Sequence, residues 1–100
     1  MIIQKWTAKT APMQLNQFLS TLAELNALYR AQGRVPWGRV HHELYGGHQI
    51  FMEREFPDIA ALDADEAKSQ SPEIRALKVR LLESIVPGSV VLTYFQTRDV

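Results

Sequence analysis

The sequence predicts an α+β fold in which four strands form one antiparallel sheet and helices cover one of its faces. The chain has 100 residues, which suits one domain, and 46% of them are hydrophobic, so it is able to form a core. Segments rich in β-forming residues alternate with segments whose apolar residues recur every three or four positions. Their order is β-α-β-β-α-β, with the second helical segment interrupted.

The first third of the chain contains the clearest patterns. Residues 1–9 are rich in β-forming side chains and predict a strand. Residues 13–31 carry apolar side chains at helical spacing and predict a helix. We expect Thr10 to cap this helix, with Pro12 in its first turn, and Gly33 to follow its last turn.

Two strands joined by a tight turn are predicted next, over residues 39–45 and 49–56, because Gly46 and Gly47 supply the positive φ angles of a hairpin. A three-residue loop separates the side chains better than a two-residue loop. It gives one mostly apolar face that suits the helices: Val40, His42, Leu44, Ile50, Met52 and Phe56. The other face is more polar: Arg39, His41, Glu43, Tyr45, Gln49, Phe51, Glu53 and Glu55.

The last third of the chain predicts a broken helix and a final strand. Asp58 is a good N-cap for a helix that residues 68–71 interrupt. Ser71 as cap and Pro72 in the first turn predict that a helix starts again there. Residues 89–97 are strongly β-forming and complete a ferredoxin-like order of elements.

The strands carry large apolar side chains on both faces, as at Ile2 and Ile3 and at Tyr94 and Phe95. Helices within the chain cover only one face, so the other face is expected to meet a partner or a ligand. A second copy is the simplest cover. We therefore expect a homodimer in which two sheets pack face to face and form an α+β barrel around a cavity.

Two short stretches, residues 52–61 and 86–89, together with the order of elements, resemble the dimeric α+β barrel superfamily. The NIPSNAP-like branch is the most similar, and antibiotic-biosynthesis-monooxygenase-like proteins belong to the same group. The resemblance implies a homodimer with a cavity in each protomer, between sheet and helices or partner. The predicted function is to bind or convert a small organic molecule at the open sheet face. Such a protein is a ligand-binding protein or a cofactor-independent, monooxygenase-like or isomerase-like enzyme. The alternative is a non-catalytic dimerisation module with a filled interface.

The densest group of titratable residues is His41-His42-Glu43, in which His41 and Glu43 lie two positions apart on one strand face. With Glu53 and Glu55 across the hairpin, this pair has the composition of a general acid–base site. A hydrogen-bonded pair with only a structural role is the alternative. A metal site is not predicted, because no regular ligand spacing such as HExxH is present.

The predicted substrate-binding residues are aromatic or cationic. Trp6, Trp37 and Tyr94 are able to line an aromatic pocket, and simple core or dimer packing is the alternative. Arg39 and Arg54 are able to bind a substrate carboxylate. The predicted substrate-binding residues are Trp6, Arg39, Tyr45, Phe51 and Tyr94.

Ion pairing on the strands and helices is the alternative to a binding role for these arginines. On that reading Arg39 and Arg54 pair with the nearby acids Glu43, Glu53 and Glu55. Asp63–Glu66 and the bases Arg75, Lys78 and Arg80 are interpreted as solvated helix faces.

Composition excludes several classes of function. Eleven basic and eleven acidic side chains cancel, which argues against partners such as nucleic acid or an anionic membrane. Cysteine is absent, so thiol chemistry is excluded. We expect no cofactor: the resemblance implies a helical axial histidine in haem-binding members, whereas His41, His42 and His48 lie in the hairpin. No secretory signal is recognised, which predicts a cytoplasmic location.

Overall fold

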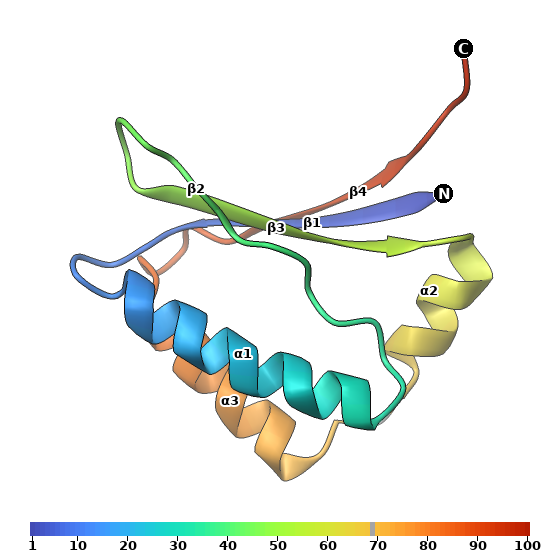
Figure 1. Cartoon of the computed structure of the whole chain (residues 1–100), viewed down its shortest axis with the longest axis horizontal. Coiled ribbons are helices and arrows are strands. Elements are labelled where there is room, and N and C mark those ends of the chain that lie inside the picture. Colours follow the sequence, from blue (N-terminus) through green and yellow to red (C-terminus); the bar gives the residue numbers. More distant parts are fainter. Residues whose placement is uncertain (69) are drawn as a thin grey trace.

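The computed structural model describes residues 1–68 and 70–100 and confirms the predicted ferredoxin-like α+β fold. One antiparallel sheet has the strand order β2-β3-β1-β4, and the helices lie on one side of it (Figure 1). The elements are β1 (Ile2–Lys9), α1 (Leu15–Ala31), β2 (His41–His42), β3 (Gln49–Phe56), α2 (Ile59–Glu66), α3 (Pro72–Glu83) and β4 (Val91–Gln96). Ser69, in the predicted interruption, lies outside the described residues.

The core forms between the sheet and helices α1 and α3. Alternation along β1 turns Ile2, Gln4, Trp6 and Ala8 toward the helices, and all four are buried. Buried side chains of β3 and of the two long helices complete the core, namely Ile50, Met52, Phe18, Leu22, Leu25, Tyr29, Ile74, Leu77 and Leu81. No helix of the described ranges is long and apolar enough to cross a bilayer.

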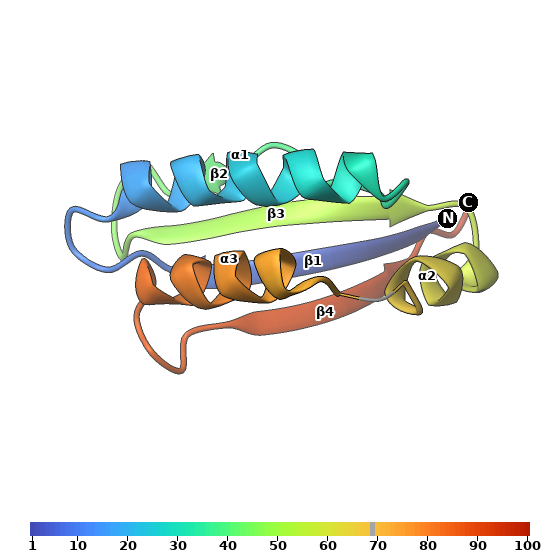
Figure 2. The same ribbon diagram turned by 90° about the horizontal axis from the view of Figure 1, so that it is seen from below.

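The edge strand β4 has little cover on either face. Figure 2 shows α1 running over β3 and α3 running over β1, with β4 beyond α3 at the edge of the sheet. Its register pairs Trp6 with Leu92 and Gln4 with Tyr94, so these two β4 residues share the helix-side face. Even so, Leu92 and Tyr94 remain 47% and 49% exposed. On the open side Phe95 is 49% exposed.

The hairpin is longer than predicted, and its strand β2 is shorter. His42 pairs with Ile50, and the Glu43 amide donates to the Gln49 carbonyl at 2.7 Å, which leaves residues 44–48 as a five-residue loop. The predicted loop had three residues. The register therefore differs by two positions, and a shift of two preserves which side chains share a face. The predicted division between helix-side and open-side residues of β3 is accordingly confirmed.

Backbone conformation in this loop also differs from the expectation. Gly46 has a positive φ of 112°, as predicted, but the second positive φ belongs to His48 at 60° rather than to Gly47. The His48 carbonyl accepts from both the backbone amide and the hydroxyl of Thr10, at 3.1 and 3.3 Å. These two bonds stabilise the conformation of a residue that otherwise disfavours positive φ.

Four of the six predicted helix boundary signals are confirmed, including Pro72 in the first turn of α3, whereas Pro12 lies before α1 rather than in its first turn. Asp58 accepts from the Ala61 amide at 2.8 Å, and Ser71 accepts from the Ile74 amide at 3.2 Å. Gly33 has a positive φ of 69° just beyond α1. The prediction for Thr10 is wrong: α1 starts later, after Gln14, and Thr10 instead forms an isolated β-bridge with Ile85.

Candidate functional site

The most promising site is a cavity of about 250 Å³ between the sheet and the helices. Its apolar part combines aromatic and aliphatic side chains from β1, β3, β4, α1, α3 and the loop after α1. They are Trp6, Trp37, Tyr29, Leu25, Met52, Leu81, Leu82 and Leu92. Polar side chains occupy the rest of the wall, namely Gln4, Arg54, Glu66, Lys78 and Tyr94. A concave, mostly apolar cavity with a few polar groups has the composition of a small-molecule site.

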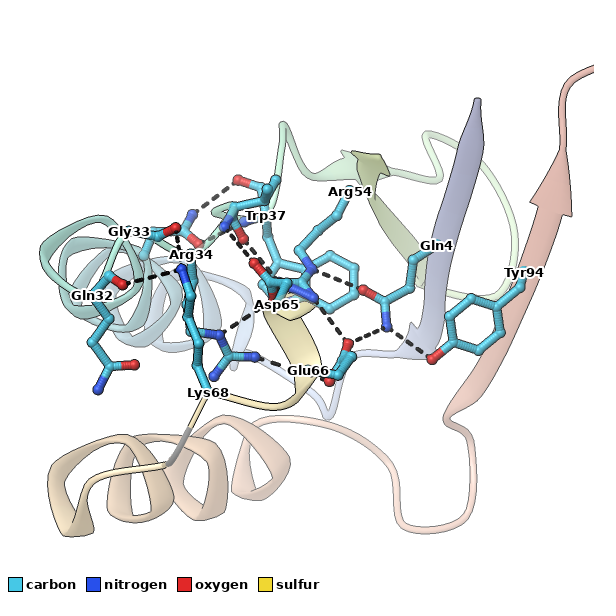
Figure 3. Close-up of polar contacts among 12 residues, drawn as sticks. Gln4, Gln32, Gly33, Arg34, Trp37, Arg54, Asp65, Glu66, Lys68 and Tyr94 are labelled. Atoms are coloured by element: carbon cyan, nitrogen blue, oxygen red, sulfur yellow. Dashed lines mark hydrogen bonds and ion pairs between the residues drawn. The ribbon is translucent and has the colours of Figure 1, made fainter. Parts of the chain in front are cut away.

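The polar part of the wall is organised by Arg54 of β3, whose side chain is 2% exposed. Its Nη1 donates to Asp65 Oδ1 at 2.7 Å and to the Val35 carbonyl at 2.9 Å. Its Nη2 donates to Glu66 Oε1 at 3.0 Å, and its Nε donates to Gln4 Oε1 at 2.8 Å (Figure 3). A buried guanidinium with so many partners is held in one orientation.

Asp65 connects this network to a second buried cation. Its Oδ1 accepts from Arg34 Nε at 3.3 Å as well as from Arg54, and its Oδ2 accepts from the Val35 amide at 2.8 Å. Arg34 also lies with its guanidinium 4.1 Å from the Tyr29 ring centre. Helix α2 is therefore attached to the sheet and to the loop after α1 through one buried carboxylate.

These contacts correct two sequence interpretations. Arg54 was expected to pair with acids of the hairpin such as Glu53 or Glu55, but it lies on the opposite face and pairs with Asp65 and Glu66. Asp65 was interpreted as part of a solvated helix face, but it is 5% exposed. Alternation explains the first difference, because consecutive residues of a strand point to opposite faces.

Two aromatic residues that the sequence singled out as binding residues, Trp6 and Tyr94, lie in the wall of this cavity. Trp37 lies there as well, and its backbone is fixed by Asn26, which accepts from the Trp37 amide and donates to the Trp37 carbonyl. Trp6 stacks on Phe18 at 5.6 Å between ring centres. The cavity is on the helix-covered side of the sheet, whereas the sequence placed a cavity at the open face.

His41 and Phe51 lie on the open face instead. Their rings stack at 4.6 Å between centres, and the ammonium of Lys5 lies 4.4 Å from the Phe51 ring centre. Arg39 is exposed and borders a shallow groove with His41 and Glu53. The predicted binding residues are thus divided between two faces of one sheet.

Glu43, the expected partner of His41, supports the hairpin loop. Its Oε1 accepts from the Gly47 amide at 2.7 Å and from the Gln49 amide at 3.3 Å. Tyr45, in the same loop, is 85% exposed. Within residues 1–68 and 70–100 the structure gives no hydrogen bond between His41 and Glu43, so their acid–base role stays a prediction.

Sequence reasoning missed the polar residues that organise the cavity. Glu66 and Lys78 were both assigned to solvated helix faces, yet both line the cavity. A usable signal existed for Arg54: it stands between Met52 and Phe56 in the alternating pattern of a strand, so its side chain points to the core. Lys78 had a signal as well, since it stands four residues after Ile74 and four before Leu82 in the apolar stripe of α3. No comparable signal exists for Glu66, because its environment depends on how α2 packs.

Metal ligation finds no support in the geometry. Across the described part of the chain, no three His, Cys, Asp or Glu side chains lie close enough together to hold a metal ion.

Comparison with known proteins gives a likeness in fold at low sequence identity. No protein-family model matches the chain, and no curated protein matches it. A NIPSNAP domain protein from Burkholderia xenovorans superposes with a TM-score of 0.76 at 11% identity, covering 98% of this chain and 95% of the other. A NIPSNAP family protein from Agrobacterium tumefaciens gives 0.74 at 14% identity, covering 98% and 93%.

An antibiotic biosynthesis monooxygenase is also similar, with a TM-score of 0.70 at 15% identity, covering 99% of this chain and all 100% of the other. These identities establish the fold and no activity. The predicted resemblance is thereby confirmed at the level of structure: this chain has the fold of NIPSNAP domain proteins and antibiotic-biosynthesis-monooxygenase-like proteins.

Proposed function

We propose that this protein binds a small organic molecule in the cavity between its sheet and helices. The observation that carries the proposal is the cavity itself: about 250 Å³, walled by aromatic and aliphatic side chains, with polar groups held in place by a buried ion network. A wall that is already ordered before binding lowers the entropy cost of holding a ligand. Conversion of the molecule by a cofactor-independent, monooxygenase-like or isomerase-like reaction stays a prediction.

Tryptophan fluorescence provides a direct test, because the chain has two tryptophans and both line the cavity. A panel of small aromatic and alicyclic compounds is titrated into the protein, and binding is expected to change the emission of Trp6 and Trp37. Calorimetry then compares two variants of α3. Leu82→Trp puts a large side chain at a 51% exposed position of the cavity wall, whereas Val79→Trp puts the same side chain at a similarly exposed position, 58%, outside that wall.

The two variants separate cavity binding from surface binding. Leu82→Trp is expected to lower the affinity for every compound that binds the wild type, and Val79→Trp is expected to leave these affinities unchanged. If both variants bind as well as the wild type, the ligands occupy another surface and the proposal fails.

We also propose that two copies of the chain pack through their open sheet faces. The supporting observation is the apolar character of that face, where Val91 is 57% and Phe95 is 49% exposed and Ile3 and Phe51 are half-buried. Apolar side chains grouped in this way mark an interaction surface. Light scattering behind size exclusion tests the assembly: a dimer has a mass of about 23 kDa, twice the 11.4 kDa of the chain.

A non-catalytic dimerisation module is the alternative, and the same open face favours it. The two readings differ in what happens when the cavity is blocked. A pure dimerisation module binds no compound of the panel, and Leu82→Trp would leave the mass of its dimer unchanged.

A further inference from the structure

The cavity and its supporting ion network carry one more positive charge than negative charge. Three cations, Arg34, Arg54 and Lys78, stand against two carboxylates, Asp65 and Glu66. Both arginines are paired with these carboxylates. Lys78 forms no ion pair in the part of the chain that the structure describes. A half-buried cation without a counter-ion favours the arrival of an anion.

Lys78 belongs to the cavity rather than to the outer surface of α3. It is half-buried, it lines the cavity wall, and its ammonium lies 5.8 Å from the ring centre of Tyr29. Leu82, one turn further along α3, lines the same wall, as expected for residues four apart on a helix. An ammonium is only a donor, so a ligand beside Lys78 must present an acceptor.

A second donor is fixed by the directions of the hydrogen bonds (Figure 3). Arg54 only donates, so the Gln4 atom that faces its Nε must be the amide oxygen. Gln4 Nε2 is then the atom that donates to Glu66 Oε1 at 3.3 Å and to the Tyr94 hydroxyl at 3.0 Å. The Tyr94 oxygen therefore accepts, and its own hydrogen stays available for a ligand.

The two donors come from the elements on either side of the half-exposed rim of the cavity. Lys78 lies on α3 and Tyr94 on β4, which run along neighbouring parts of the sheet in Figure 2. Beyond them the wall is apolar, with the indole rings of Trp6 and Trp37. A cavity of about 150 Å³ holds one benzene molecule. A volume of about 250 Å³ therefore suits one or two fused rings with a small substituent.

We propose that the cavity ligand is a small aromatic monocarboxylate, with its ring among the tryptophans and its carboxylate held by Lys78 and the Tyr94 hydroxyl. One negative charge balances the Lys78 ammonium, which has no ion pair among the described residues, whereas a dianion such as a phosphate monoester leaves a charge uncompensated. The inference rests on the proposed function, because it names the class of molecule that the cavity binds.

Matched pairs of ligands test the charge separately from the ring. Benzoate with benzamide, and 2-naphthoate with 2-naphthamide, have the same rings and differ in the charge of one group. Calorimetry on the full chain is expected to give at least about tenfold tighter binding of each carboxylate than of its amide, the size typical of a hydrogen bond to a charged group. Lys78→Met is expected to weaken binding of the carboxylates much more than binding of the amides, and so to reduce that preference.

The control is Lys5→Met, which deletes a lysine on the open face, away from the cavity. It is expected to leave the ratio of carboxylate affinity to amide affinity unchanged, because any effect on the open face acts equally on both ligands. Tyr94→Phe is expected to lower the affinity for the carboxylates several-fold, because it removes one neutral hydrogen-bond donor. Both lysine variants are checked for unchanged thermal unfolding, so that a lost affinity is not a lost fold.

Two results overturn the inference in different ways. The first result is that the amides bind the wild type as tightly as the carboxylates, or that Lys5→Met and Lys78→Met lose affinity equally. Either outcome overturns the inference of a monocarboxylate ligand, while the proposal of a small-molecule site stands. If no acid of the series binds while a neutral compound of the wider panel does, the inference fails and the proposed function stands. If no compound of either set binds, both fail.

Discussion

Replacing Asp65 by Ala should strongly destabilise the protein, because this carboxylate is the counter-ion of two buried guanidinium groups. The side chains of Arg34 and Arg54 are 1% and 2% exposed, and Asp65 Oδ1 accepts from them at 3.3 and 2.7 Å. The Val35 amide loses its acceptor as well. Arg54 keeps its contact with Glu66 at 3.0 Å, whereas Arg34 keeps only a contact of 4.0 Å with that residue. Leaving a buried charge without its partner costs about 3–5 kcal/mol, against a total stability of about 5–15 kcal/mol for a typical domain.

This loss of stability is large enough to measure by thermal unfolding. For a domain of this size each kcal/mol shifts the melting temperature by about 4–8 °C, so Asp65→Ala should lower it by at least about 12 °C. Asp63→Ala is the matched control, since Asp63 lies two positions away on α2, is exposed, and forms no ion pair among the described residues. Surface substitutions of this kind stay within about 0.5 kcal/mol. Equal melting temperatures for the two variants would refute the assignment of Asp65 as the buried counter-ion.

Three further substitutions test other parts of the molecule. Phe95→Asp places a charge on the open sheet face and should reduce the mass in solution from about 23 kDa, the mass of two chains, to 11.4 kDa. A folded dimer of this variant would contradict the sheet-to-sheet assembly. Glu43→Ala removes the acceptor of the Gly47 amide and should lower the free energy of unfolding in urea by about 1 kcal/mol, while the affinity of cavity ligands stays constant. Loss of ligand binding in this variant would instead support a functional role for Glu43. Ser71→Ala removes the cap of α3 and should also cost about 1 kcal/mol, with Ser20→Ala in the exposed part of α1 as the comparison.

Local signals were sufficient to predict the fold. Each helix boundary depends on a few neighbouring residues, as at the Asp58 cap, the Ser71 cap and the glycine after α1. Such an interaction can be predicted from the local sequence, because all of its partners are close along the chain. The hairpin shows the limit of such reasoning. A loop of five residues and one of three have the same parity, and the alternation of polar and apolar residues cannot tell them apart.

The candidate site was harder to predict because its polar residues find partners far along the chain. Arg54 bonds to Gln4, 50 positions away, and Gln4 bonds to Tyr94, 90 positions away. Charge matching in the sequence favoured the nearer acids Glu53 and Glu55 for Arg54. Strand geometry is the better guide here, because it places those two acids on the other face of the sheet.

Strand β4 contributes to two surfaces through adjacent residues. Tyr94 faces the cavity, and Phe95 faces the open side of the sheet. Among the described residues β4 pairs with β1 only, and its side chains are largely exposed on both faces, so a neighbour on either face would add to the contacts that hold it. Whatever immobilises β4 from one side removes part of the entropy cost of binding on the other. Occupation of the cavity and assembly of two copies would then strengthen each other by the same factor, as thermodynamic linkage requires.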